Sequence, residues 1–318
     1  MPWPKTTITI DSGETKEAIA PLIISASRST DIPAFYGAWF LRRLDAGYAR
    51  WVNPFSGKPV YVSFENARAF VFWSKNPLPF LPLLKELDRR NLTYYFQVTV
   101  NDYEKEGLER GVPALAERIH AFKRLSGLIG KERVLWRFDP LLLTASLSPA
   151  ELLLRIRQIG NQLAGYTGRL TVSFITLYGK VARNLYNAGI RIRAWDDAAR
   201  TLVLKEIGAA ARAWEMRAVS CADKNDYSPF GIAHGRCVDG ALIARLAGNR
   251  GPVAELLKRG GCTKDKGQRP HCGCAAGKDI GAYNTCGHAC VYCYANASPQ
   301  SAAGNLQRHA IESDSIIF

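Results

Sequence analysis

Between residues 20 and 220, short apolar runs rich in β-branched and aromatic residues alternate with longer amphipathic stretches. Pro21–Ala26, Ala69–Trp73 and Arg133–Phe138 have the pattern of buried strands. Pro113–Leu128 carries apolar residues at helical spacing. Because strands that alternate with helices form parallel sheets, this stretch predicts an α/β fold of about six strand–helix units.

Six units are too few for a closed eight-stranded barrel and suit an open, partial (β/α) barrel. A doubly wound sheet is the alternative, since strand order cannot be derived from one sequence. No Gly-rich phosphate-binding fingerprint follows the first strand, which disfavours a dinucleotide fold. We expect a partial barrel over residues 1–220, a Cys-rich cluster-binding region over 221–297, and a weakly helical, partly disordered tail over 298–318.

Local signals place several element ends. Asp31 is expected to cap a helix that starts near Pro33 and ends at Gly47. Ser148 opens another helix with a capping-box pattern. Further elements are a hairpin (48–52 and 59–64), strands (93–100, 170–176 and 216–220) and helices (up to about 90, 180–188, 195–214 and 240–259).

All eight cysteines fall in the last third of the chain, and none occurs before Cys221. Hydrophobic residues make up 47%, enough for a sizeable core, but no apolar run is long enough for a membrane span. The N-terminus lacks the pattern of a signal peptide, so we expect a cytoplasmic protein with no membrane partner. In a reducing compartment, clustered thiols more often bind metal than form disulfides.

Three cysteines stand close together at Cys286, Cys290 and Cys293. Three thiolates are one ligand short of a closed tetrahedral site, and short cysteine spacings are typical of iron–sulfur clusters. We predict a 4Fe-4S cluster with three protein-bound irons and one iron open to a small molecule. His288, inside the motif, is expected to contact a neighbouring group or solvent instead of metal.

Four of the remaining cysteines, Cys221, Cys237, Cys272 and Cys274, are enough for a second, closed site. We predict an auxiliary 4Fe-4S cluster there, with zinc as the alternative because four thiolates suit it equally. A third interpretation is that some of them are small buried residues. Cys262 is expected to be a free thiol.

Lys and Arg exceed Asp and Glu by 14, which favours anionic partners or simply makes the surface basic. No long Lys/Arg block is present, so a nucleic-acid-binding arm is not indicated.

In (β/α) barrels, chemistry lies at the carboxyl ends of the strands. Basic side chains there could bind a carboxylate or phosphate, and acidic ones could bind ribose hydroxyls or a substrate amine, or simply cap helices. The candidate catalytic residues are Arg28, Asp31, Lys75, Arg137 and Asp139. The candidate cofactor-binding residues are Ser25, Asn76, Gln97 and Ser173.

The three cysteines, with the aromatic Tyr292 just before the last, resemble the cluster motif of the radical S-adenosylmethionine superfamily. The resemblance implies that S-adenosylmethionine binds the open iron beside Tyr292, and that reductive cleavage yields a 5′-deoxyadenosyl radical. In that superfamily the motif follows the first strand of the barrel. Here it comes after all the strand–helix units, so the cysteine loop must fold back to the strand ends near Ser25–Asp31.

Four segments also resemble an uncharacterised bacterial family, domain of unknown function eighteen-forty-eight. They are Ile24–Pro33, Phe72–Pro77, Trp136–Pro140 and Asp279–Cys286, and the similarity spans about residues 20 to 297. This family is noted for a C-terminal cysteine cluster like that of radical S-adenosylmethionine enzymes. The resemblance therefore implies the cluster and leaves the substrate open.

These patterns predict a radical S-adenosylmethionine enzyme with two 4Fe-4S clusters. Its expected partners are S-adenosylmethionine, a reducing protein such as ferredoxin or flavodoxin, and an anionic substrate, with nucleic acid among the candidates. One alternative is a nucleic-acid-binding or repair protein with structural zinc or iron–sulfur sites. Another is a non-catalytic iron–sulfur module for electron transfer or sensing.

Overall fold

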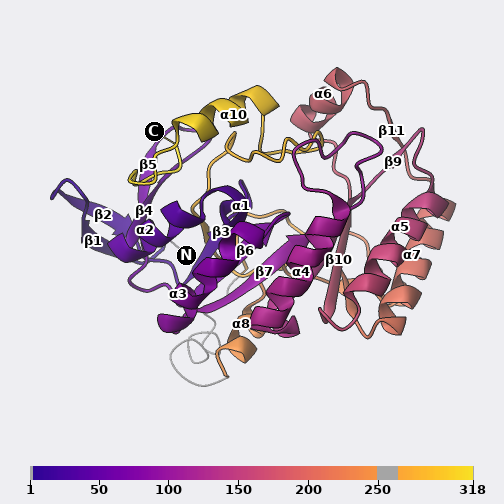
Figure 1. The fold of residues 1–318 in the computed structure, drawn as a ribbon, viewed down its shortest axis with the longest axis horizontal. Coiled ribbons are helices and arrows are strands. Elements are labelled where there is room, and N and C mark those ends of the chain that lie inside the picture. Colours follow the sequence, from indigo (N-terminus) through magenta and orange to yellow (C-terminus); the bar gives the residue numbers. More distant parts are fainter. Residues whose placement is uncertain (1–2, 249–263, 318) are drawn as a thin grey trace.

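A computed structural model describes residues 3–248 and 264–317, and its centre is an eight-stranded parallel sheet (Figure 1). The fold class is α/β, as the sequence predicts. In spatial order the strands are β13 (Ala233–His234), β12 (Arg217–Ser220), β10 (Arg169–Phe174), β8 (Val134–Leu141), β7 (Thr93–Thr99), β6 (Ala69–Ser74), β3 (Ile23–Ala26) and β14 (Lys278–Asp279).

From β3 to β13 the strands lie side by side in chain order, and β14 returns from near the C-terminus to pair with β3. This order lacks the reversal that defines a doubly wound sheet. Among the described residues no pairing joins β13 to β14, so the sheet is not a closed barrel. Both edge strands come from beyond residue 221, so the Cys-rich region completes the same sheet.

The central strands end at the same edge of the sheet. β3 pairs with β6 up to Ala26↔Phe72, and β6 runs two residues further and pairs with β7 up to Ser74↔Val98. The segments after these strands therefore leave the sheet at the same edge, which brings together residues 27–31, 75–77 and 100–101.

The helices cover mainly one face of the sheet. Phe72 and Phe96, on neighbouring strands, stack there with ring centroids 4.7 Å apart. The helices of the described chain are α1 (Ile32–Phe35), α2 (Gly37–Ala46), α3 (Leu84–Arg89), α4 (Leu115–Ile129), α5 (Pro149–Leu163), α6 (Gly179–Asn187), α7 (Asp197–Ala213), α8 (Gly240–Leu246) and α10 (Pro299–Arg308), with 3-10 turns η1 (Leu78–Leu83), η2 (Lys131–Arg133) and η3 (Ser228–Phe230).

The opposite face of the sheet carries the alternate side chains. Val71, Tyr95 and Leu135 pack there against α8 and against Cys237 and Cys274. Because successive side chains of a strand point to opposite faces, one set builds the helix-covered core and the other contacts the Cys-rich segment.

A small four-stranded sheet, in the order β1-β2-β5-β4, flanks the main one. The predicted hairpin is confirmed as β4 (Tyr48–Val52) and β5 (Pro59–Ser63). β1 (Lys5–Thr9) and β2 (Thr15–Ile19) were not predicted, because their exposed, polar alternation lacks an apolar signal. A short pair, β9 (Leu143–Thr144) with β11 (Ile192–Arg193), lies between α6 and the α5–α7 helices in the view of Figure 1.

The predicted helix caps are confirmed with one correction. Asp31 accepts a hydrogen bond from the Ala34 amide, and Gly47 ends α2 at φ 77°. Ser148 caps α5 by accepting from the Glu151 amide. The single helix predicted from Pro33 to Gly47 is two helices, because Tyr36 lies between them at φ −130°.

Residues 298–317 contain α10 and pack against the N-terminal part of the chain. Arg50 pairs with Asp314 at 2.8 Å, and Trp39 Nε1 donates to the Ser313 carbonyl. No helix within 3–248 and 264–317 is long and apolar enough to cross a membrane. Cys262 and the later part of the predicted 240–259 helix lie outside the described residues.

Candidate functional site

The cysteine loop, residues Cys286–Cys293, lies at the carboxyl ends of β3 and β6. His288 Nε2 is 2.7 Å from Asp31 Oδ2, and the same oxygen accepts from Ser74 Oγ at 3.1 Å and from the Lys75 amide at 2.7 Å. Asp31 therefore joins the loop to two strand ends and also caps α1. His288 was expected to contact either a neighbouring group or solvent. It is 2% exposed, so it contacts a neighbouring group.

A buried polar network attaches the second half of the loop. Lys75 Nζ lies 2.5 Å from Glu109 Oε1 and 3.0 Å from the hydroxyl of Tyr292, which itself donates to Glu109. Asn101 donates to the Tyr292 hydroxyl at 3.2 Å, and Arg118 lies 3.4 Å from the other Glu109 oxygen.

Charge pairing in this network outweighs burial. Burial favours the neutral forms of Lys75 and Glu109, but their mutual attraction raises the pKa of Lys75 and, together with Arg118, lowers the pKa of Glu109. Both groups therefore stay charged beside the loop, and Glu109 forms a backbone bridge with Cys290.

The three thiols of the loop influence one another electrostatically. Burial is the largest cause that raises the pKa of Cys286, of Cys290 (to about 12) and of Cys293. Nearby thiols raise the pKa of Cys286 and Cys290 further, whereas Lys75 lowers that of Cys290. Such thiols ionise readily only when a cation takes up their charge, which is the chemistry of a metal-ligand set.

Backbone contacts hold the loop against the segment between β7 and α4. The Gly111 amide donates to the His288 carbonyl at 2.9 Å, and the Val291 amide donates to the Leu108 carbonyl at 2.9 Å. A Cβ atom on Gly111 would lie 2.6 Å from the Gly287 carbonyl oxygen, so only glycine permits this approach.

Asp279, at the end of β14, ties the start of the loop to β3. Its carboxylate accepts from Ser27 Oγ at 2.8 Å and from the Arg28 amide at 2.7 Å. On the other side of the loop, the Tyr294 hydroxyl donates to the Arg28 carbonyl at 2.7 Å.

The second cysteine group, Cys221, Cys237, Cys272 and Cys274, gathers on the sheet face opposite the main helix layer. The sulfurs of Cys221 and Cys237 are 3.1 Å apart, and the Cys237 amide lies 3.1 Å from the Cys274 sulfur. Hydrogen bonds from Cys221 and Cys274 lower the pKa of Cys237. A hydrogen bond from Cys274 also lowers the pKa of Cys272, to about 6. The thiols of Cys221 and Cys274, which donate, have raised pKa values.

Predicted strand-end residues surround this group. Arg137 Nη1 lies 3.0 Å from the Cys237 sulfur, and Gln97 donates to the Cys237 carbonyl at 2.8 Å. Arg137 also pairs with Asp139, which accepts from Ser173. The structure thus places Gln97, Arg137, Asp139 and Ser173 beside the second cysteine group. Asp31 and Lys75 lie beside the cysteine loop, which itself contains Tyr292.

Arg28 lies between the two cysteine sets. Its guanidinium is 5.2 Å from the Trp73 ring centroid, and Nη2 is buried without a hydrogen-bond partner among the described residues. Burial opposes its charge, but Cys274, Asp279 and Cys237 more than offset burial and raise the pKa of Arg28.

Two predicted site residues of the described chain form hydrogen bonds with neither the cysteine loop nor the second cysteine group. Ser25 is fully buried, and its hydroxyl has no partner in the described chain. Asn76 accepts from the Leu78 amide, as expected of a turn residue. Two site residues, Glu109 and Tyr95, were not predicted. Glu109 lies in a loop without a motif. Tyr95 donates to the Cys237 carbonyl, but its sequence pattern is that of an ordinary strand residue.

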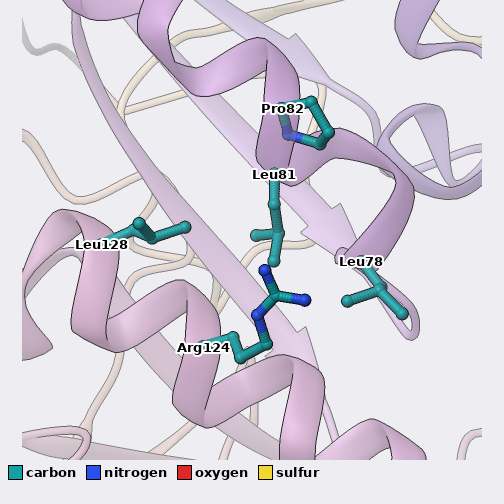
Figure 2. A pocket seen from close by; sticks show the side chains of 5 residues that line it. All are labelled: Leu78, Leu81, Pro82, Arg124 and Leu128. Atoms are coloured by element: carbon teal, nitrogen blue, oxygen red, sulfur yellow. The ribbon is translucent and has the colours of Figure 1, made fainter.

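No three His, Cys, Asp or Glu side chains within 3–248 and 264–317 are arranged to hold a metal ion as they stand. A hollow of about 290 Å³ lies between η1 and α4. Figure 2 shows Arg124 extending toward Leu81 there. Leu78, Pro82 and Leu128 complete its lining, and none of these five is a predicted site residue.

The match to a family model agrees with the sequence resemblance. The model, described as domain of unknown function DUF1848, matches residues 23–295. The chain belongs to this family. The matched region of this DUF1848 protein includes β3 at its start and the whole cysteine loop at its end. No curated protein and no solved structure matches the chain.

Proposed function

We propose that this protein is a radical S-adenosylmethionine enzyme whose catalytic 4Fe-4S cluster is held by Cys286, Cys290 and Cys293. The main support is the position of the cysteine loop, which His288 and Asp31 join to the carboxyl ends of β3 and β6. Three thiols thus meet the strand-end side chains although they are remote in sequence. The sequential strand order, open between β13 and β14 in the described chain, supports a partial (β/α) barrel.

A cluster held by Cys286, Cys290 and Cys293 would supply the electron for reductive cleavage of S-adenosylmethionine to methionine and a 5′-deoxyadenosyl radical. The residues of this chain bind and orient the cofactor and the substrate, and they exclude water from the site. Lys75 places a positive charge beside Cys290, where it stabilises the thiolate. Asp31 is a positioning residue, because its two oxygens already accept from Ala34, Ser74, Lys75 and His288.

Arg28 is the group best placed to bind an anion. Its buried Nη2 has no partner among the described residues, and Asp265 is 3.9 Å from its other terminal nitrogen. A carboxylate or phosphate of cofactor or substrate would satisfy that donor. Arg137 and Asp139, paired with each other beside Cys237, act on the second cysteine group.

We also propose that Cys221, Cys237, Cys272 and Cys274 hold an auxiliary 4Fe-4S cluster. The Arg137 guanidinium and the Cys237 amide both lie at hydrogen-bond distance from thiol sulfurs, as is common around cluster ligands. Zinc remains the alternative for four thiolates.

Anaerobic reconstitution followed by iron and sulfide counting tests both sites, together with a reductant-dependent assay for 5′-deoxyadenosine. We expect about eight irons per chain, because two 4Fe-4S clusters hold that number. We also expect 5′-deoxyadenosine when a reductant, or a reduced ferredoxin or flavodoxin, is supplied. Zinc alone without 5′-deoxyadenosine would refute the enzyme. A redox-active cluster that binds no S-adenosylmethionine would instead indicate an electron-transfer or sensor module.

A further inference from the structure

A basic, aromatic surface lies beside the cysteine loop and has no part in the proposed chemistry. We define this α6 surface as the exposed and half-buried side chains of residues 177–193. It carries four cations, the exposed Arg183, Arg191 and Arg193 and the half-buried Lys180, and the sequence from 175 to 195 contains no Asp or Glu. None of the four cations forms an ion pair with another described residue.

Large apolar and aromatic side chains are exposed among these cations. Tyr186 is 84% exposed, and Leu177 and Tyr178 are also exposed. On α6, Val181 and Leu185 face the core, so Arg183 and Tyr186 project from the opposite side. An exposed tyrosine beside arginines that have no ion-pair partner in the described chain offers a stacking face next to positive charge.

The same surface contains a shallow groove of about 360 Å³. Leu177, Ala182, Leu185, Tyr186 and Ile190 line it, with Arg191 among the lining residues. An apolar groove with one aromatic wall and a neighbouring guanidinium suits a planar ring that carries an anionic group. This combination is found in a nucleotide, whose base stacks and whose phosphate pairs with arginine.

The α6 surface contacts the residues on both sides of the cysteine loop. Lys180 Nζ lies 5.2 Å from the ring centroid of Tyr283, and Tyr178 and Tyr294 have centroids 6.5 Å apart. Asn184 donates to the Asn296 carbonyl at 3.3 Å. In Figure 1, α6 stands at the same end of the molecule as α10, which follows the loop.

We propose that the α6 surface docks a single strand of nucleic acid and presents one nucleotide to the catalytic centre at the cysteine loop. The chemistry of that nucleotide rests on the proposed function, whereas docking depends on the surface alone. An acidic protein would also be attracted by the charge, but the groove and the highly exposed Tyr186 favour an occupant with bases.

Fluorescence anisotropy of the reconstituted protein with labelled oligouridine or oligothymidine of about 12 nucleotides tests the docking. We expect binding that weakens with salt, with a slope of log K against log salt of about −3 for four phosphate contacts. Tyr186→Ala should weaken binding about 5- to 150-fold, the range measured for one stacked base. The two probes show whether the strand is RNA or DNA.

Charge variants separate local docking from general attraction. Arg183→Gln/Arg191→Gln should weaken binding and flatten the salt slope by about 1.4, because each lost contact removes about 0.7. The control Lys85→Gln/Arg124→Gln removes the same charge from exposed positions on α3 and α4 and should bind like wild type. Equal binding by all variants, or no binding at low salt, would overturn the proposal.

Iron content and 5′-deoxyadenosine formation, measured on the same samples, distinguish failure of the docking from failure of the enzyme. If 5′-deoxyadenosine forms but neither oligonucleotide binds, the docking is wrong and the enzyme stands. If the strands bind without any 5′-deoxyadenosine, the enzyme is wrong and the docking stands. If α6 variants slow reduction by flavodoxin while no strand binds, the surface docks an electron donor and the docking proposal fails.

Discussion

His288 Nε2 lies 2.7 Å from Asp31 Oδ2, a contact between residues 257 positions apart. It joins the cysteine loop to the helix cap that follows the first strand of the main sheet. Asp31 also accepts hydrogen bonds from Ser74 and from the Lys75 amide, so one carboxylate sets the relative positions of two strand ends and the loop.

This contact predicts that His288→Ala lowers both stability and cluster content. We expect a loss of about 1.5–3 kcal/mol in the free energy of unfolding, because the bond involves a charged acceptor. Asp31→Ala should cost more, since four donors lose their partner. Urea titration and iron counting measure the two effects. His120→Ala, at an exposed position on α4, is the control and should match wild type.

Removing either member of the Lys75–Glu109 pair should destabilise the protein unequally. Breaking a buried pair costs about 3–5 kcal/mol. Glu109→Gln should cost more than Lys75→Met, because it leaves Lys75 buried without a carboxylate partner and leaves Arg118 with Glu104 alone. In Lys75→Met, Glu109 keeps Arg118. Equal losses in denaturant unfolding would contradict this order. Lys5→Met, in the exposed pair with Glu17, should change little.

The same pair predicts a pH dependence of stability. The folded pKa of Glu109 lies below its usual 4.5, so its contribution is fully present above that pH and is lost as the pH falls through the folded pKa. Wild type should therefore lose more stability than Glu109→Gln on acidification below pH 4.5. Unfolding curves collected over this range check the difference, and parallel curves for the two proteins would show that Glu109 does not contribute.

Substitution of Gly111 should loosen the cysteine loop. A Cβ atom there would lie 2.6 Å from the Gly287 carbonyl oxygen, and relieving such overpacking costs about 1–3 kcal/mol. Gly111→Ala should lower the melting temperature and the iron content together. Gly127→Ala is a matched control in α4, where nothing lies within 4 Å, and should stabilise by about 1 kcal/mol.

Serine substitutions should show how much iron each of the two proposed sites holds. Replacing Cys286, Cys290 or Cys293 should remove about four of eight irons and abolish 5′-deoxyadenosine formation. Replacing Cys237 should also remove about four irons, through the second cysteine group. Cys262→Ser, the expected free thiol, should retain all of them. Loss of all iron from any single substitution would show that the two sites do not form independently.

Much of the main sheet could be predicted, because its signals are local. Ile23–Ala26 and Ala69–Ser74 are apolar runs, and Asp31, Gly47 and Ser148 mark helix ends with their own side chains or backbone conformations. The β1–β2 hairpin was not predicted, because its strands are mostly exposed and carry no apolar pattern. Tyr36 interrupts the first helix through its backbone conformation, for which no residue-type signal exists.

The cysteine spacing by itself determined which thiols could share a cluster, since Cys286, Cys290 and Cys293 lie within one short loop. Only the tertiary structure decided what surrounds them. The Lys75–Glu109–Tyr292 network and the contact of Cys221 with Cys237 depend on strands that end at the same edge and on a C-terminal segment that returns to β3. Such contacts join residues remote in sequence, and their free energy comes from burying paired charges and thiols together, which no local pattern encodes.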